Sequence, residues 1–345
     1  MVPVDEYVSA LKREMDLRFP DHDPWPVDTL YFGGGTPSRL GGEGVARAIE
    51  AVRSRLSLEP NAELTIEANP EDITAANARM WRDAGVNRLS IGSQSFDDRV
   101  LAWMHRTHDA AAIGRAVDVA RAAGIDNFSL DLIFSLPEHI ERSWESDVSR
   151  ALALGPSHLS LYGLTIEPHT PLGRWHARGD VIESPDEKYE HEFLHAHAAL
   201  TAAGFEHYEV SNFGKADRRS RHNSSYWANV PYAGLGPSAH EFDGAVRRWN
   251  ASAYAEWVAR LADRQDPMES SETLDAGNRA AEAVYLGLRT TDGLELRAGE
   301  LAQVQPWVDA GWAVRRGDNR LVLTPLGWLR LDALAAALTH VRSRY

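Results

Sequence analysis

YFGGGTPS, from Tyr31 to Ser38, ends an apolar run in three consecutive glycines. Residues without a Cβ let the backbone approach a ligand closely, and the Thr36-Pro37 pair then fixes how the chain leaves the turn. The segment is not a phosphate-binding loop, because no Gly-Lys-Ser/Thr follows, and it does not match the dinucleotide pattern GxGxxG. A ligand-binding turn is therefore expected here, with a tight connection between a strand and a helix as the purely structural alternative.

Short apolar runs on both sides of this segment alternate with segments of helical period. The runs cover residues 29–32, 63–67, 88–91, 127–134 and 158–164. Such alternation predicts a parallel sheet that is either doubly wound or closed into a barrel. In a parallel sheet each connecting helix follows a strand, yet the helix expected over 5–19 precedes the first run. We therefore expect that a first strand is missing from this sequence.

Polar residues gather just past the ends of these runs. In α/β barrels, binding sites form where several parallel strands place polar groups at the same rim. The sequence therefore predicts one binding site at the carboxyl ends of the strands, formed by Gly33–Pro37, Glu67, Asn69, Gln94, Asp131, Thr165 and Glu167.

The second half of the chain shows weaker patterns. A helix is expected over 185–203 and a strand near 207–211, whereas 212–257 is rich in glycine and aromatic residues and has no clear period. A polar linker after Asp266-Pro267 leads to two helices and to a hairpin of 313–316 and 320–323, joined by a tight-turn sequence. We expect a barrel over 1–211, an extension over 212–265 and a winged-helix-like domain over 275–345.

Composition excludes several classes of function. The 345 residues include 36 Lys and Arg against 50 Asp and Glu, and the resulting formal charge of −14 makes nucleic acid a poor partner. With 0 cysteines, this sequence has no disulfide, no thiol nucleophile and no cysteine-held metal. No signal peptide is visible, and no apolar run approaches the roughly 18 residues needed for a membrane span. We expect a cytoplasmic protein.

Six segments, in order along the chain, resemble the successive motifs of the HemN/HemW branch of the radical S-adenosylmethionine (SAM) superfamily. They are Tyr31–Ser38, Ile66–Pro70, Leu89–Phe96, His105–His108, Leu130–Pro137 and Leu159–Pro168. The resemblance implies an α/β fold, namely a partial (β/α) barrel of radical SAM type without its first strand, followed by a winged-helix-like domain. It also implies S-adenosyl-L-methionine as a cofactor.

The resemblance assigns a role to each matching residue. The methionine end of the cofactor would lie against Gly34, Gly35 and Thr36, with the Glu67 carboxylate facing the same ligand. Gln94, Arg106 and Asp131 would complete the polar shell, and Thr165 would lie beside the adenosyl portion. These residue types suit a zwitterionic sulfonium, which needs a carboxylate near its amine and a cation near its carboxylate. No catalytic residue is predicted.

Two later segments, Arg221–Trp227 and Gly234–His240, resemble the HemW side of the branch, which implies haem binding. His222, Tyr226 and His240 are the candidate haem contacts, since a histidine beside aromatic rings is a reasonable axial ligand for a flat macrocycle. The alternative is a buried histidine whose two ring nitrogens are both hydrogen-bonded. The resemblance further implies delivery of haem, or a related porphyrin, to acceptor proteins.

The main departure from the family concerns its iron–sulfur cluster. Members carry Cys-x3-Cys-x2-Cys after the first strand, and these thiolates hold a [4Fe–4S] cluster that cleaves the cofactor. As written, this sequence can neither hold the cluster nor cleave SAM. Either the sequence begins downstream of the true start, which we favour, or the protein is a natural relative without a cluster; DNA upstream of Met1 distinguishes the two. A smaller departure is His169, where relatives tend to have glycine.

Three other functions remain as alternatives to a haem chaperone. One is oxygen-independent coproporphyrinogen III oxidation, a radical decarboxylation in porphyrin biosynthesis, and another is a pure binding module without a radical step. The third is a zinc hydrolase, because HEFLH at His191–His195 matches the HExxH signature. Helical geometry opposes this match, since His191 and His195 fall opposite the apolar stripe that contains Phe193. The pair would then face water without a third ligand.

Overall fold

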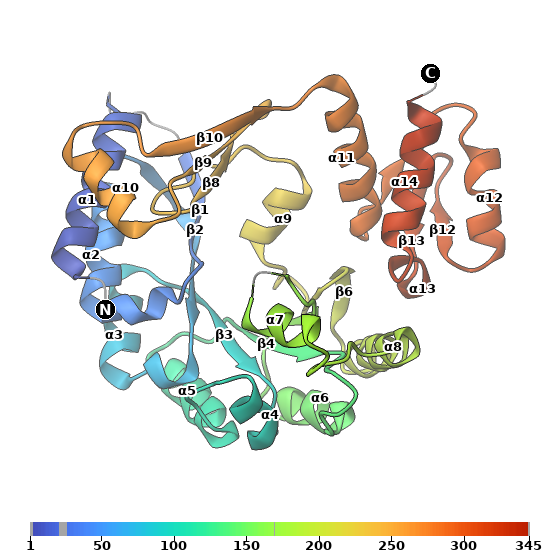
Figure 1. Cartoon of the computed structure of the whole chain (residues 1–345), viewed down its shortest axis with the longest axis horizontal. Coiled ribbons are helices and arrows are strands. Elements are labelled where there is room, and N and C mark those ends of the chain that lie inside the picture. Colours follow the sequence, from blue (N-terminus) through green and yellow to red (C-terminus); the bar gives the residue numbers. More distant parts are fainter. Residues whose placement is uncertain (1–2, 21–25, 169, 344–345) are drawn as a thin grey trace.

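The structure, a computed structural model, describes residues 3–20, 26–168 and 170–343 and is organised around one curled sheet (Figure 1). The strand order is β1-β2-β3-β4-β5-β7-β6. The first five strands are parallel, β7 is antiparallel to β5, and β6 is antiparallel to β7. The strands are β1 (Pro26–Phe32), β2 (Ser57–Ala68), β3 (Arg88–Gln94), β4 (Phe128–Phe134), β5 (His158–Gly163), β6 (Glu206–Glu209) and β7 (Asn212–Gly214). This open half-barrel confirms the expected fold class.

Alternation along the strands divides the sheet into two chemically different faces. Successive strand residues point to opposite sides, so in β2 the buried Leu64, Ile66 and Ala68 share the face that packs in the main hydrophobic core. The helices that follow the strands cover this convex face (Figure 1). They are α2 (Gly41–Arg53), α3 (Ala75–Ala84), α4 (Asp98–Trp103), α5 (Ala110–Ala122), α6 (Trp144–Ala153) and α8 (Asp186–Ala202), with α1 (Val4–Arg18) packed beside α2.

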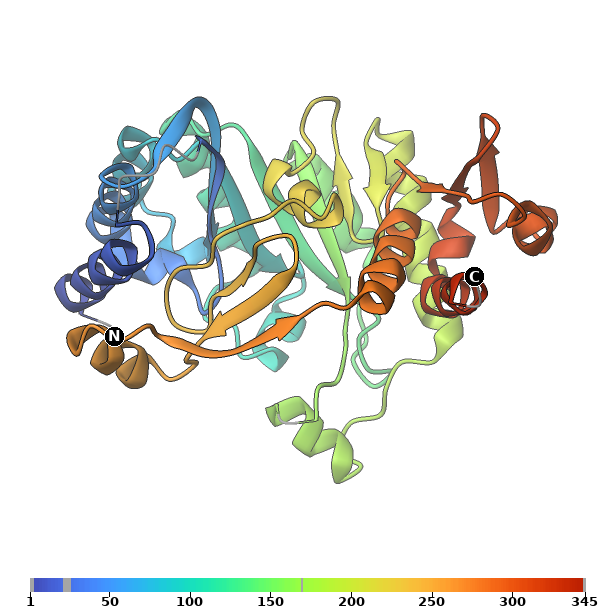
Figure 2. The ribbon, with the colours of Figure 1, turned by 90° about the horizontal axis from the view of Figure 1, so that it is seen from above.

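The concave face is polar, and polar groups that are shielded from water need hydrogen-bond partners. Its side chains come from alternate positions of β1 to β5: Thr29, Tyr31, Glu63, Thr65, Glu67, Ser90, Ser129, Asp131, His158 and Ser160. Helix α9 (Arg221–Trp227) lies within the curve of the sheet (Figures 1 and 2). The Glu63 carboxylate accepts hydrogen bonds from the backbone N–H groups of Arg221 and His222 at its first turn, at 3.3 and 3.1 Å. No residue of α9 is fully buried, so polar contacts hold this helix in place.

A second, three-stranded sheet lies beside the part of the half-barrel formed by α1 and β1 (Figure 1). It has the order β10-β9-β8, from β8 (His240–Phe242), β9 (Val246–Asn250) and β10 (Met268–Thr273). The polar linker expected after Asp266-Pro267 is wrong, because the residues that follow this pair form the strand β10. Every residue of β10 is exposed, so no apolar alternation marks it in the sequence, and pairing with β9 alone defines it.

Helix α10 (Tyr254–Ala262) joins this sheet to α1 through a buried carboxylate. Glu14 is fully buried and accepts hydrogen bonds from Gly236 N at 2.8 Å, Asn250 Nδ2 at 2.6 Å and Trp257 Nε1 at 3.1 Å. Trp257 is also buried, in a second hydrophobic cluster with Met15. The extension is therefore fixed to the outside of the half-barrel.

The C-terminal unit is a small α/β arrangement with the sheet order β11-β13-β12. Its elements are α11 (Ala276–Arg289), β11 (Leu294–Glu295), α12 (Leu301–Asp309), β12 (Ala313–Arg316), β13 (Arg320–Leu323), α13 (Pro325–Trp328) and α14 (Leu331–Arg342). The hairpin has the predicted bounds, and the ring of Trp328 packs edge-on against His207 of β6. The main sheet itself continues to Gly214, beyond the barrel boundary expected at 211. Among the described residues, no helix is long and apolar enough to cross a membrane.

Candidate functional site

The glycine turn after β1 combines an unusual backbone with open space. Gly34, Gly35 and Thr36 have φ values of 77°, 65° and 96°, which a β-branched residue such as Thr36 rarely adopts. A Cβ at Gly33 would collide with the Tyr31 ring, so packing requires that glycine. A Cβ at Gly34 or Gly35 would meet no atom within 4 Å. The turn therefore offers its backbone to a space that a ligand can enter.

Glu67, near the end of β2, is fixed beside this turn. Its carboxylate accepts a 2.6 Å hydrogen bond from the Tyr31 hydroxyl and a 3.1 Å hydrogen bond from Gly34 N. Burial and the negative charge of Glu67 raise the pKa of Tyr31 far above its ordinary value, so the phenol remains a donor. The Glu67 carboxylate is thus oriented towards the glycine turn.

Asp131 lies in β4 among hydroxyl donors. Ser90 donates to both of its oxygens, at 2.8 and 3.0 Å, and Ser129 donates at 3.1 Å. Burial raises the pKa of Asp131 to about 6; the seryl hydrogen bonds oppose this shift and nearby Glu67 adds to it. The pKa of Asp131 therefore lies well above that of an exposed aspartate.

A hydrogen-bond chain links Asp131 to the start of α9. His158 Nδ1 lies 2.9 Å from Ser129 Oγ, and His158 Nε2 lies 2.8 Å from the Tyr208 hydroxyl, which accepts a bond from Ser220 N at 3.2 Å. Burial holds the pKa of His158 well below its ordinary value, so the ring is neutral. Ser129 donates to Asp131. With its proton on Nδ1, His158 donates to Ser129 and accepts from the Tyr208 hydroxyl. Every donor in this series then points towards the Asp131 carboxylate.

Arg106, Gln94 and Asn69 form a polar group at the end of β3. Arg106 Nη1 donates to Asn69 Oδ1 at 3.4 Å, and both Gln94 and Asn69 border Gly92. Burial lowers the pKa of Arg106, while the negative charges of Glu71 and Asp131 oppose that shift. Gln94 has a φ of 62°, so the chain turns sharply as β3 ends. These interactions place a guanidinium within the electrostatic reach of Asp131.

Some of the predicted cofactor residues are therefore connected to one another. Gly34 contacts Glu67 directly, and Asp131 interacts electrostatically with both Glu67 and Arg106. A carboxylate pair, a guanidinium and an open glycine backbone are groups that suit a zwitterionic ligand. Thr165 lies exposed just past β5, and the described residues include no hydrogen-bond partner for its side chain. His169 lies outside the described residues.

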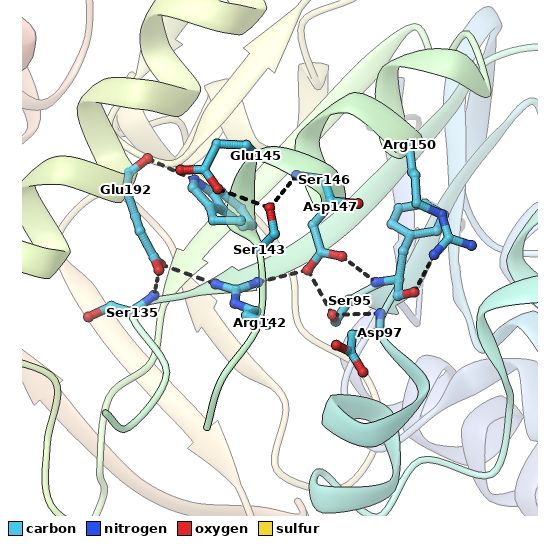
Figure 3. Close-up of polar contacts among 12 residues, drawn as sticks. Ser95, Asp97, Ser135, Arg142, Ser143, Glu145, Ser146, Asp147, Arg150 and Glu192 are labelled. Carbon is cyan, nitrogen blue, oxygen red and sulfur yellow. Dashed lines mark hydrogen bonds and ion pairs between the residues drawn. The ribbon is translucent and has the colours of Figure 1, made fainter. Parts of the chain in front are cut away.

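A buried ionic network behind this site holds the loops that follow β3 and β4 (Figure 3). The Arg142 guanidinium bridges Asp147 at 2.8 Å and Glu192 at 3.1 Å. Asp147 accepts from Ser95 Oγ and Phe96 N just past β3, and Glu192 accepts from Ser135 N just past β4. The side chains of Arg142, Asp147 and Glu192 are 1%, 3% and 7% exposed, so the network is shielded from water.

The same network argues against the zinc-hydrolase alternative. Glu192, the glutamate of the HExxH match, is committed to Arg142 and the Ser135 backbone, while His191 lies exposed on α8. The described part of the chain contains no group of three histidine, aspartate or glutamate side chains that could hold a metal ion. A glutamate that balances a buried arginine cannot also serve as the base of a zinc site.

The candidate haem residues lie in two places. The His222 ring stacks on Tyr31 and has both nitrogens engaged, Nδ1 with Thr29 Oγ1 at 2.9 Å and Nε2 with the Tyr226 hydroxyl at 2.8 Å. Burial lowers the pKa of His222 to about 4. His240 is exposed on β8 and stacks on Trp249, with ring centroids 5.8 Å apart. The structure thus brings His222 and Tyr226 together and leaves His240 on the separate sheet.

Several residues of the site did not stand out in the sequence. Tyr31, Ser90 and Ser129 contact the carboxylates directly, although only Glu67 and Asp131 were singled out. The available signal was the two-residue period of a strand. Ser129 lies two positions before Asp131, and strand neighbours at that spacing share a face.

Comparison with known proteins places these features in a family. A family model described as "Radical SAM superfamily" matches residues 8–151. The heme chaperone HemW of Synechocystis is 35% identical over 335 residues, which cover 93% of this chain and 81% of that protein. The heme chaperone HemW of Mycobacterium tuberculosis is 36% identical over 340 residues, which cover 98% and 87%.

A solved structure confirms the fold. Coproporphyrinogen III oxidase (HemN) from Escherichia coli, described as a radical SAM enzyme, superposes with a TM-score of 0.81 over 97% of this chain and 83% of that chain. Its sequence identity is 22%, so the likeness concerns the fold. The half-barrel and the match to that family model define a protein of the radical SAM class. Within that class, the chain belongs to the HemW family.

Proposed function

We propose that the protein is a haem chaperone that binds haem and S-adenosylmethionine and passes haem to acceptor proteins. The observation that carries this proposal is the extent of the similarity to HemW proteins, which reaches across 98% of the chain rather than the half-barrel alone. In this proposal residues 1–211 form the cofactor-binding barrel, 212–265 a haem-associated extension and 275–345 a winged-helix-like domain. A cytoplasmic location remains a prediction.

The polar group at the mouth supplies the contacts for S-adenosylmethionine. Glu67, already oriented by Tyr31 and Gly34 N, would accept from the cofactor ammonium, and Arg106 would face its carboxylate. Gly34 and Gly35 would admit the methionine end, and Thr36, Gln94, Asp131 and Thr165 would complete the shell. Because the Asp131 carboxyl titrates near pH 6, its charge and hence its attraction for a cation depend on pH in the neutral range.

The residues present do not fit a [4Fe–4S] cluster. The family resemblance implies three cysteine thiolates, and this sequence has 0 cysteines. The chain's own residues therefore support binding of the cofactor and of haem without a cluster.

Coproporphyrinogen III oxidation is the second candidate, favoured by the fold likeness to HemN. A binding experiment separates the two functions. The purified chain is titrated with hemin and, separately, with coproporphyrin III, while the Soret band is followed. A haem chaperone should bind hemin more tightly, whereas tighter binding of coproporphyrin III would favour the oxidase.

Binding of S-adenosylmethionine is tested by equilibrium dialysis of the labelled cofactor. Replacement Glu67→Gln removes the negative charge at nearly constant shape and should weaken binding about tenfold or more, because a charged hydrogen bond is worth roughly 1.5–3 kcal/mol. Glu187→Gln, at an exposed position of α8, is the matched control. Equal affinity of the Glu67→Gln variant and the unaltered chain would argue against this assignment.

A further inference from the structure

The turn after β2 is bonded to two other segments of the candidate cofactor site. It covers Asn69–Asp72, which we name the NPED turn, and its last three residues form one turn of 3₁₀ helix. On one side, Asp72 accepts a 2.6 Å hydrogen bond from Ser38 Oγ, and Asn69 N donates to the same hydroxyl at 3.3 Å. Because Ser38 lies directly after the glycine turn, this side of the NPED turn holds the glycine turn in place.

The other side of the NPED turn holds the segment that carries Arg106. Thr107 Oγ1 donates a hydrogen bond to Glu71 Oε1, and His108 Nδ1 lies 3.2 Å from Glu71 Oε2. Arg106 itself donates to Asn69 Oδ1 at 3.4 Å. Three consecutive residues that follow β3 are therefore bonded to one short turn that follows β2.

The Glu71 carboxylate is charged, and both of its oxygens are engaged by the protein. Burial alone would raise its pKa, but the interactions with Thr107 and His108 outweigh burial and hold the pKa below its ordinary value. The side chain of His108 is 0% exposed, and its second nitrogen, Nε2, lies 3.5 Å from Ser93 O. Glu71 therefore acts on neighbouring side chains and is not left free to contact a ligand.

The charge of Glu71 also acts on the guanidinium of Arg106. Burial lowers the pKa of Arg106, and of the two carboxylates that oppose this shift, Glu71 contributes more than Asp131. In the parts of the chain that the structure describes, no carboxylate lies within ion-pair distance of Arg106. Glu71 thus supports the cation from a distance, and the guanidinium keeps donors for a ligand.

We propose that Glu71 is a positioning residue that makes the cofactor site select a ligand with a carboxylate. The ammonium and the carboxylate of an amino acid are attached to the same carbon atom. A site that binds both groups must therefore hold Glu67 and Arg106 at a fixed separation, and the NPED turn does this by joining the glycine turn to the segment of Arg106. This inference rests on the proposed binding of S-adenosylmethionine and adds a residue that determines its specificity.

The test compares S-adenosylmethionine with its decarboxylated analogue, which keeps the ammonium, the sulfonium and the adenosyl group. Equilibrium dialysis of the whole chain with each labelled ligand gives the two affinities. Glu71→Gln should weaken binding of S-adenosylmethionine about threefold to tenfold and leave binding of the analogue unchanged. Glu67→Gln should weaken both, because both ligands carry the ammonium. The exposed replacement Glu187→Gln on α8 should match the unaltered chain for both ligands.

A double-mutant cycle separates positioning of Arg106 from a general structural role of Glu71. Arg106→Met removes the group that meets the carboxylate, so S-adenosylmethionine should bind this variant more weakly while the analogue binds as before. Glu71→Gln should then cause no further loss in the Arg106→Met background, because it acts through the missing guanidinium. Circular dichroism verifies that each variant is folded.

Three results would overturn the proposal. They are an equal loss of both ligands in Glu71→Gln, an unaltered affinity of that variant for S-adenosylmethionine, and a full additional loss when Glu71→Gln is combined with Arg106→Met. A different result, no binding of either ligand by the unaltered chain, would remove the proposed cofactor binding itself and this inference with it.

Discussion

The imidazole of His222 lies flat against the phenol ring of Tyr31, with centroids 4.7 Å apart and planes inclined by 8°. The hydroxyl of that same tyrosine donates to Glu67, which in turn accepts from Gly34 N. One side chain therefore contacts both the helix inside the half-barrel and the carboxylate of the candidate cofactor site. A movement of α9 would therefore reach the glycine turn through the contacts of Tyr31 and Glu67.

Replacement Tyr31→Phe separates these two contacts. The phenyl ring keeps its stacking on His222 but leaves Glu67 without one of its donors, so binding of S-adenosylmethionine should weaken about threefold to tenfold. Equilibrium dialysis measures the affinity, and circular dichroism checks the fold. An unaltered affinity would show that Glu67 does not need this bond to meet the cofactor.

Asp131→Asn should make stability depend less on pH. The folded-state pKa of Asp131 is raised from 3.8 to about 6, so its contribution to stability is fully present below about pH 4 and is lost as the pH rises through 6. Above that value the charge in this half-buried position costs on the order of 3 kcal/mol, which the amide avoids. The melting temperature of the variant should exceed that of the unaltered chain at pH 8 but not at pH 4. A constant difference across this range would contradict the raised pKa.

Arg142→Met should strongly destabilise the fold. It leaves the carboxylates of Asp147 and Glu192 buried without their shared cation, a change that costs about 3–5 kcal/mol. Urea unfolding measures the loss. Arg178→Met breaks an exposed pair with Asp180 and should cost less than about 1 kcal/mol. Similar losses of unfolding free energy in the two variants would show that the buried ion pairs stabilise the fold no more than an exposed pair does.

Glu14→Ala should loosen the extension from the half-barrel. The change deprives Gly236 N, Asn250 Nδ2 and Trp257 Nε1 of their acceptor, at a cost of about 1–3 kcal/mol for each donor left buried. Limited proteolysis should then cut between 234 and 262 sooner than in the unaltered chain. The exposed replacement Glu50→Ala on α2 is the control. Identical cleavage of all three proteins would show that apolar contacts alone fix the extension.

Elements with a strong local signal were predictable from the sequence. The five parallel strands, the helix before them and the hairpin of β12 and β13 follow from periodicity and turn residues. The glycine turn, Glu67 and Asp131 were also predicted to meet, because the carboxyl ends of parallel strands share one edge. For these residues, chain order and strand direction are enough.

Features that depend on contacts between distant segments were not predictable. Nothing in the sequence near Glu192 indicates that Arg142 would neutralise it, and β10 has no apolar face to mark it as a strand. Trp103, His105, His139 and Trp175 come from the connections after three different strands and line one pocket, although they appear as unrelated residues along the chain. Only their arrangement in space brings out a shared chemistry.

The exposed strand β10 has a consequence for handling the protein. It lies at one edge of its sheet, so its outer backbone groups are available for pairing with another copy. Glu269 and Glu272 on this strand would place like charges side by side in such a pair, and their repulsion opposes it. Because dissolved ions screen that repulsion, concentrated salt should promote self-association through this edge, and dilute buffer should suppress it.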